Sequence, residues 1–275
     1  MRLSIRHSTS YVYDVPPLLA LQRLRLGPPS GPDLRVHMWR IDLEGAREEA
    51  SFVDGHGNST MLVSSAPNAD AMTVTVTGDV ETLRSDGVVG TMPGVSRWLY
   101  RRTTPLTAPG VRVRGLATHV DGTLASLHDL TRRVREAIDY RIGETDAETT
   151  AEAALAAGTG VCQDHAHAFC AAARVAGVPA RYVSGYLRMD DREEQDAMHA
   201  WAEAFVDGLG WVGFDPANGY SPDERYVAVA RGLDYRDAAP VQGLVRGIGA
   251  GERTERMDVS LVVRPLPDAQ SQQQQ

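Results

Sequence analysis

The stretch Gly160-Val161-Cys162-Gln163-Asp164-His165-Ala166-His167 decides how the rest of this chain can be understood. It follows a glycine-rich turn over residues 156–160 and opens an alanine-rich run. Small or apolar residues recur along that run at the spacing of one helical face. Gly177 and Pro179 predict the end of the helix, because glycine favours a helix C-cap and proline cannot continue a helix. Cys162 is therefore expected in the first turn of a buried helix.

A thiol in the first turn of a helix lies beside backbone N–H groups that have no intrahelical acceptor. The positive end of the helix dipole acts on it as well, and both effects favour the thiolate. This is a suitable position for a nucleophile. The alternative is that Cys162 is a small core residue, as many buried cysteines are. The residues downstream decide between the two.

A predicted β-hairpin supplies the partners that a thiolate nucleophile needs. Residues 198–206 and 211–216 alternate with the period of two that is typical of strands, and the segment Asp207-Gly208-Leu209-Gly210 joins them as a turn. His199 begins the first strand and Asp215 ends the second, so the hairpin brings both to the same end. A cysteine, a base and an acceptor that orients the base have the composition of a catalytic triad.

The register of this hairpin determines whether His199 and Asp215 can meet, because side chains alternate faces along a strand. Pairing of Phe205 with Trp211 makes His199 the diagonal neighbour of Asp215, whereas a register shifted by one residue points Asp215 away. We predict the first register, with the loop running over residues 206–210. One ring nitrogen of His199 should then bind Asp215, and the other should face the Cys162 sulfur at about 3.5 to 4 Å.

Three motifs in this order resemble the bacterial transglutaminase-like superfamily, whose core is shared with papain-type cysteine proteases. They are GVCQDHAHAF (160–169), ARYVSGYL (180–187) and HAWAEAFVDGLGWVGFDPANG (199–219). The resemblance covers about residues 149–219 and implies that Cys162 is the nucleophile, His199 the base and Asp215 the residue that orients it. It also implies an α+β fold, in which the nucleophile helix packs on an antiparallel β-sheet. Members of the family commonly carry an aromatic residue where this chain has His165.

Composition narrows the class of protein. The 275 residues are 43% hydrophobic and 23% charged, which is typical of globular domains, and the formal net charge of −8 argues against nucleic-acid binding. No apolar run reaches membrane-spanning length, and the N-terminus reads as a strand and not as a signal peptide. The two cysteines, Cys162 and Cys170, are about 12 Å apart along a helix and too distant for a disulfide. We expect a reduced, cytoplasmic protein without a cofactor, and the sequence leaves its oligomeric state open.

Three regions are predicted along the chain. Residues 1–95 form a β-rich N-terminal domain, in which residues 72–80 are the clearest strand and residues 54–58 form a turn. This segment resembles the β domain that precedes the core in many bacterial relatives, and its own residues indicate no chemistry. Residues 96–267 are predicted as the catalytic domain, with closing strands near its end. Residues 268–275 read as a disordered polar tail.

A metal site is the first rival interpretation, because cysteine, aspartate and histidine are all ligand types. Residues two apart on a helix point to roughly opposite sides, so His165 and His167 cannot both join Cys162 around one ion. We predict no metal, and we interpret both histidines as partly exposed helical residues. The acidic run at residues 190–196 lacks the spacing of a calcium loop.

Several further side chains near the motifs have simple interpretations. Trp201 and Trp211 are predicted to pack the hairpin against the nucleophile helix. Tyr186 ends its strand close to the expected pocket, without a catalytic role. Glu203 shares a strand face with His199, and we interpret it as solvent-exposed more readily than as a second acceptor for that histidine.

The predicted function is that of a cysteine hydrolase, a peptidase or amidase, acting on an amide of a peptide or protein through a thioester. A protein-glutamine transamidase would use the same three residues, and the sequence does not separate the two. The alternative of another class is a non-catalytic scaffold that binds a peptide in the same cleft. The presence of all three residue types argues against the scaffold.

Overall fold

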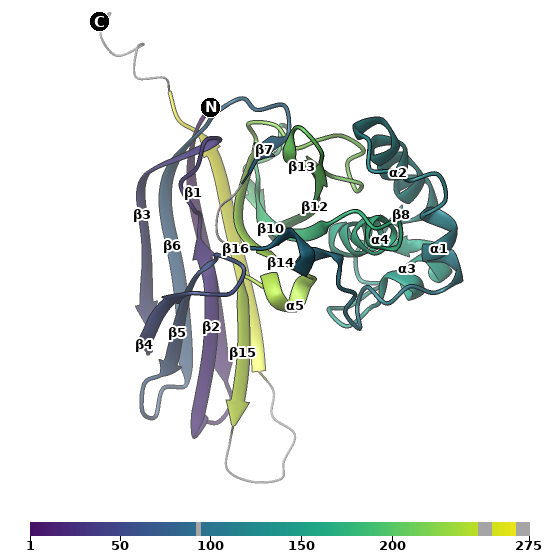
Figure 1. Ribbon diagram of the computed structural model, residues 1–275. Helices are drawn as coiled ribbons and strands as arrows, with labels where there is room; N and C mark the ends of the chain where they lie inside the picture. The colour runs from purple at the N-terminus through teal and green to yellow at the C-terminus, as the bar shows by residue number, and fades with distance from the viewer. Residues whose placement is uncertain (92–94, 247–254, 268–275) are drawn as a thin grey trace, which may run out of the picture.

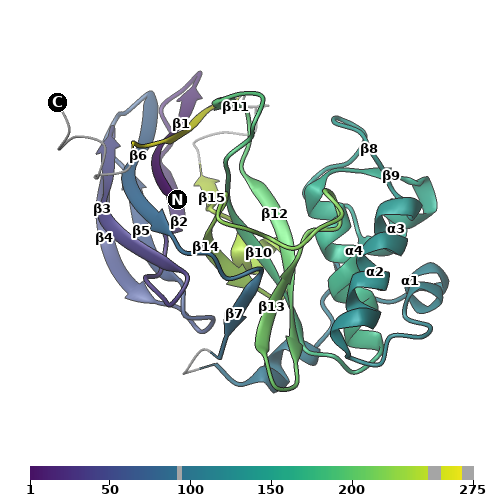
Figure 2. The same cartoon turned by 90° about the horizontal axis from the view of Figure 1, so that it is seen from above.

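The strands near the N-terminus follow directly from alternation. In β1 (Arg2–Tyr13) and β6 (Ala71–Thr82), every second side chain is buried, which is the pattern of a sheet with one face on a core. The protein, described by a computed structural model, has three layers: a β-sandwich, a central sheet and a group of helices (Figures 1 and 2). The structure describes residues 1–91, 95–246 and 255–267. The predicted polar tail at residues 268–275 lies outside them.

Two antiparallel sheets form the sandwich. Their strand orders are β11-β16-β1-β6-β3 and β15-β2-β5-β4. The remaining strands of these sheets are β2 (Leu19–Gly27), β3 (Leu34–Glu44), β4 (Ala46–Val53), β5 (Ser59–Ser65), β11 (Glu194–Gln195), β15 (Val241–Arg246) and β16 (Glu255–Pro265). One core lies between the two sheets, and a second lies where the larger sheet packs on the central sheet.

The central sheet has the order β14-β10-β12-β13-β7. Its strands are β7 (Val88–Gly90), β10 (Ala180–Leu187), β12 (His199–Val206), β13 (Gly210–Phe214) and β14 (Tyr226–Gly232). Every residue of β10 is buried, because the sandwich covers one face of the sheet and the helices cover the other.

The helical layer lies on the far side of the central sheet (Figure 2). It contains α1 (Val111–Leu116), α2 (Leu124–Ala137), α3 (Ala151–Ala157), α4 (Cys162–Val175) and α5 (Tyr235–Ala238), with the short pair β8 (Asp139–Tyr140) and β9 (Thr159–Gly160). The short helix η1 (Arg97–Arg101) instead packs its Tyr100 on Trp211 of β13. The central helix is α4, which buries small side chains that let neighbouring elements approach closely. Its Phe169 stacks on Phe214 of β13, with ring centroids 5.1 Å apart. None of the described helices is long and apolar enough to cross a membrane.

Sheet pairing links the two ends of the chain. β16 pairs with β1 and β15 pairs with β2, so residues 241–265 complete the sandwich, although we predicted them as part of a catalytic unit spanning residues 96–267. Conversely, β7 lies within the predicted N-terminal domain (residues 1–95) but pairs with β13 and so belongs to the central sheet. Strand pairing depends on partners far apart in sequence, which local patterns do not specify.

The turn at residues 54–58 holds the sandwich against the central sheet. The Asn58 side chain donates to the Arg231 carbonyl and accepts from the Arg231 N–H, both at 2.8 Å. Within the turn, Asp54 accepts from the backbone N–H groups of His56 and Asn58 at 2.9 and 3.0 Å. The loop is thus a rigid contact between the layers, a role that its sequence did not reveal.

Candidate active site

The start of α4 is built from the glycines and the acid of the opening motif. Gly158 caps α3 with φ +71°, a left-handed conformation that favours glycine. A Cβ on Gly160 would lie 2.7 Å from the Asp164 Cβ, so only glycine fits there. The Asp164 carboxylate accepts from the Val161 N–H at 2.8 Å and from the Thr145 hydroxyl at 2.7 Å. These contacts make Cys162 the first residue of the helix, as predicted, with its side chain partly exposed.

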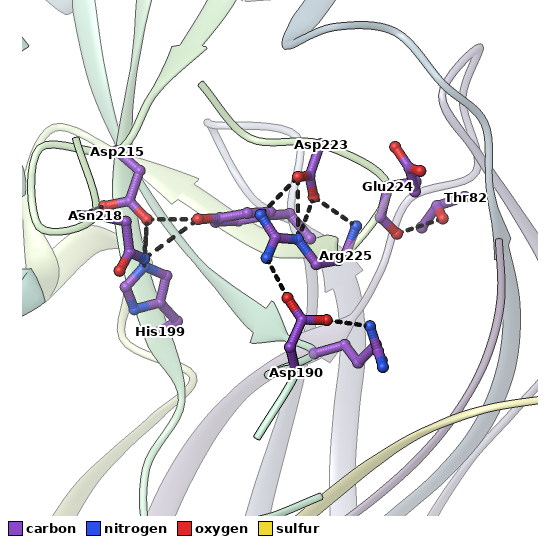
Figure 3. Close-up of polar contacts among 10 residues, drawn as sticks. Thr82, Asp190, His199, Asp215, Asn218, Asp223, Glu224 and Arg225 are labelled. Atoms are coloured by element: carbon purple, nitrogen blue, oxygen red, sulfur yellow. Dashed lines mark hydrogen bonds and ion pairs between the residues drawn. The ribbon is translucent and has the colours of Figure 1, made fainter. Parts of the chain in front are cut away.

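The hairpin has the predicted register. Phe205 pairs with Trp211 and Val206 with Gly210. As a result, Nε2 of His199 lies 2.6 Å from Oδ2 of Asp215 (Figure 3). Nδ1 is left for the thiol, and its separation of about 3.5 to 4 Å from the sulfur stays a prediction.

Two further residues hold Asp215, and the sequence analysis missed both. The Asn218 side chain donates to Oδ2 at 2.8 Å (Figure 3). The Tyr226 hydroxyl donates to the same oxygen at 2.7 Å, and the Asn218 backbone N–H donates to Oδ1 at 3.2 Å. Asn218 could have been found, because residues 215–219 read as a turn, in which an aspartate side chain commonly accepts from backbone N–H groups a few residues on. Tyr226 begins β14, an edge strand that β10 and β12 separate from β13, and it leaves no local signal.

These contacts determine the charges at the site. Burial by itself lowers the pKa of His199, but the charges of Cys162 and Asp215, with hydrogen bonds to both, raise it to about 10. Burial likewise favours neutral Asp215, yet the His199 charge and the hydrogen bonds from His199, Tyr226 and Asn218 lower its pKa. The geometry therefore favours an imidazolium at His199, held between the Asp215 carboxylate and the Cys162 sulfur.

Tyr140 also contacts Cys162. β8 pairs with β9 so that Tyr140 lies opposite Gly160, two residues before the cysteine. Its ring stacks on His165, with centroids 6.1 Å apart. Burial, the Cys162 charge and a hydrogen bond to its side chain raise the pKa of Tyr140 to about 12, against the opposing effect of a hydrogen bond to the Cys162 backbone. Its hydroxyl therefore stays protonated beside the sulfur, a placement that comes from a two-residue strand pair too short to predict.

The two helical histidines are not partly exposed, so that prediction was wrong. His165 is buried, with Nδ1 2.8 Å from the Val161 carbonyl and Nε2 3.0 Å from the Ile138 carbonyl. His167 is buried as well, accepts from the Tyr235 N–H at 3.0 Å, and has its pKa lowered to about 3, mainly by burial. Both faces of α4 are covered because it is the central helix of its layer. Among the described residues, no group of three or more histidine, cysteine or acidic side chains could hold a metal.

The predicted exposure of Glu203 was also wrong. It is buried and forms ion pairs with Arg181 and Arg231. Trp201 and Trp211 do not pack against α4, so that prediction was wrong as well. They lie on the opposite face of the sheet, where they contact Tyr226 and Tyr100, respectively. The strand residues that do face α4 are alanines together with Val212 and Phe214. Small side chains let the helix lie close to the sheet, so the bulky tryptophans occupy the other face.

A cavity of about 520 Å³ opens at Cys162 and His199. Its lining is mainly apolar. It comes from the sandwich on one side and from the segments around the central sheet and α4 on the other. The core contributes Tyr140, Ile142, Met198 and Tyr235, and the sandwich contributes His7, Thr9, Tyr11, Val241, Met257 and Val259. Tyr186 is fully buried behind this wall. The second cysteine, Cys170, is buried in α4, and burial raises its pKa to about 11.

Comparison with known proteins agrees with this architecture. Residues 113–216 match the model of the transglutaminase-like superfamily, and residues 3–81 match the bacterial transglutaminase-like N-terminal region. An uncharacterized protein of Mycobacterium leprae is 30% identical, over 90% of this chain and 95% of that relative. One from Mycobacterium tuberculosis (strain ATCC 25618 / H37Rv) is 37% identical over 51% of this chain and 47% of its own length.

The fold is shared with a solved structure. The crystal structure of a protein from Cytophaga hutchinsonii, named "Putative Cysteine Protease", superposes with a TM-score of 0.73 at 19% identity, covering 98% of this chain and 92% of that one. The matched family regions include the segment that carries Cys162, His199 and Asp215 as well as the first strands of the sandwich. The chain belongs to the transglutaminase-like superfamily.

Proposed function

We propose that this protein is a cysteine hydrolase that cleaves an amide through Cys162, His199 and Asp215. The observation that carries the proposal is the 2.6 Å contact between His199 Nε2 and Asp215 Oδ2, at the mouth of a cavity that Cys162 also lines. The name of the Cytophaga hutchinsonii protein supports the same class of reaction.

The proposed reaction has two halves. The Cys162 sulfur attacks the amide carbonyl carbon, the C–N bond breaks, and the proton of His199 passes to the leaving nitrogen. Water then attacks the thioester, one of its protons passes to His199, and the C–S bond breaks to release a carboxylic acid and restore the thiolate beside the imidazolium. Asp215 keeps the imidazole oriented and stabilises its charged form.

The developing oxyanion needs hydrogen-bond donors. The first-turn N–H of Cys162 is one candidate, because the first N–H groups of a helix lack intrahelical acceptors. The Tyr140 hydroxyl lies beside the same sulfur and remains protonated. We assign both as donors to the oxyanion.

Selective alkylation tests the nucleophile. Iodoacetamide at neutral pH should label Cys162 much faster than Cys170, which is buried and has a raised pKa, and peptide mapping by mass spectrometry reads out each site. His199→Ala should remove this selectivity. Equal labelling of both cysteines, or labelling of Cys170 alone, would contradict the ion pair.

Trapping with hydroxylamine tests the intermediate. Incubation with a library of peptide amides should yield hydroxamates, because hydroxylamine captures a thioester, and Cys162→Ser should yield none by this route. The product in the presence of a primary amine separates hydrolysis from transamidation. A binding scaffold would give neither acid nor hydroxamate with any library member.

A further inference from the structure

The inward face of β1 changes character along its length. Its residues at positions 3 and 5 are apolar and lie in the core between the sandwich and the central sheet, and Tyr11 and Tyr13 lie in the core of the sandwich. Between them come His7 and Thr9, both buried at 3% exposure. A polar pair in the middle of an apolar strand face needs an explanation, since burying polar groups costs free energy unless they are hydrogen-bonded. These two residues line the cavity that contains Cys162.

His7 and Thr9 form a chain of hydrogen bonds with Tyr186. The Tyr186 hydroxyl lies 3.2 Å from Nδ1 of His7, and the Thr9 hydroxyl lies 3.1 Å from Nε2. Burial lowers the pKa of His7 to about 4, so the ring is neutral near pH 7 and carries one proton. The three groups therefore hold three polar hydrogens but make two contacts with one another, which leaves one hydrogen over.

The position of that extra hydrogen determines which group donates in each of the two hydrogen bonds. If Thr9 donated to His7 and His7 to Tyr186, the tyrosine O–H would be left in an apolar core, and no described residue offers it another acceptor. A buried donor without an acceptor is costly. The opposite direction runs from Tyr186 to Nδ1 and from Nε2–H to Thr9 and avoids this cost. It leaves the Thr9 hydroxyl proton free on the wall of the cavity.

We infer that the N-terminal sandwich binds the substrate, with Thr9 donating a hydrogen bond to a carbonyl oxygen on the acyl side of the scissile amide. The apolar side chains beside it, including Tyr11, Met257 and Val259, form a subsite for a bulky apolar side chain. The substrate class is therefore a peptide-like acyl donor with a residue such as leucine or phenylalanine next to the cleaved bond. This inference rests on the proposed function, because it places the substrate carbonyl at Cys162.

Affinity labels with matched structures test the inference. The probes are N-acetyl-leucyl chloromethyl ketone, the same ketone without its acetamido group, and the N-acetyl-aspartyl analogue. In the wild type, the leucyl probe should show an inhibition constant at least about tenfold lower than the aspartyl probe, because burying a leucine side chain is worth roughly 1.5 to 3 kcal/mol. Thr9→Val keeps the shape but removes the donor. It should raise the constant of the acetamido probe by about three- to tenfold, the usual worth of one hydrogen bond, and leave that of the truncated probe unchanged.

Two variants of the same strand serve as controls. Thr9→Ser keeps the hydroxyl and should restore wild-type binding. Ser8→Ala lies on the opposite face, where Ser8 contacts Thr75 and not the cavity, and should bind as the wild type does. Equal constants for Thr9→Val and the wild type would overturn the inference, as would equal weakening of both leucyl probes or a slower reaction of Thr9→Val with iodoacetamide. Failure of the proposed function would look different, since Cys162 would then label no faster than Cys170 in the wild type.

Discussion

One strand of the central sheet carries two buried ionic clusters that differ in kind. At the start of β12, His199 contacts Asp215 and the thiol that lines the cavity. Four residues along the same strand, Glu203 contacts Arg181 and Arg231, and its side chain is 1% exposed. Both clusters pair opposite charges, and both have their charged forms maintained by neighbours.

The difference lies in which members can exchange protons. An imidazole can give up its proton and take it back during a reaction, whereas an arginine remains charged at every pH that a folded protein meets. The first cluster also borders the cavity of about 520 Å³, whereas Arg181 of the second packs against an aromatic side chain, with its guanidinium 4.1 Å from the Trp211 ring centre. We conclude that a buried ion pair indicates chemistry when its members titrate and a substrate can reach it. Otherwise it holds the layers together.

Removal of the nucleophile should have the largest effect. Cys162→Ala should lower turnover on the order of 10⁶-fold, the scale seen when other triads lose their nucleophile, while the free energy of unfolding changes by no more than about 1 kcal/mol. Cys170→Ala is the matched control, because this buried cysteine should affect stability and leave activity intact. Measurable turnover by Cys162→Ala would place the nucleophile elsewhere.

Breaking the cluster of Glu203, Arg181 and Arg231 should lower stability, whereas loss of Cys162 lowers turnover. Glu203→Gln removes the negative charge that Arg181 and Arg231 share and should cost about 3 to 5 kcal/mol of stability, lowering the melting temperature by roughly 10 °C. The low pKa of Glu203 means that its contribution is present above the unfolded pKa near 4.5 and is lost as pH falls. Calorimetry at pH 7 measures the loss. Glu136→Gln, the same change in an exposed pair with Arg132, should cost no more than about 0.5 kcal/mol.

Asp215→Asn should weaken turnover by roughly tenfold to ten-thousandfold, because the imidazole loses its orienting anion. The pH profile sharpens the test. Wild-type turnover should fall as pH rises through the His199 pKa of about 10, since the imidazolium is then no longer available to protonate the leaving amine. Without the Asp215 charge that pKa drops, so the alkaline limb should move to lower pH. If the alkaline limb of the profile stayed at the wild-type pH, a group other than Asp215 would be stabilising the charged form of His199.

Tyr140→Phe should lower kcat by about 10² with little change in KM, as expected for the loss of one oxyanion donor. The phenylalanine keeps the ring that stacks on His165, so the melting temperature should hardly change. Steady-state kinetics separates the two constants. A rise in KM with kcat unchanged would assign Tyr140 to substrate binding and remove it from the oxyanion site.

The sequence alone predicted the start of α4, the hairpin register and the meeting of His199 with Asp215. These depend on local rules: glycine conformations, helix capping, and alternation along two strands joined by a short loop. The contact of Asn218 with Asp215 also depends on a local rule, because both residues belong to one short turn, and the sequence could have predicted it.

Only the tertiary structure decided the rest. His165, His167 and Glu203 were predicted to face solvent, because helical or strand periodicity cannot show that a second layer covers both sides of an element. The return of β15 and β16 to the sandwich, the contact of Tyr226 with Asp215, and the position of Thr9 in the cavity each join residues far apart in the chain. Such contacts depend on how the layers pack against one another. No local stretch of the sequence determines that packing, because it depends on residues spread over the whole chain.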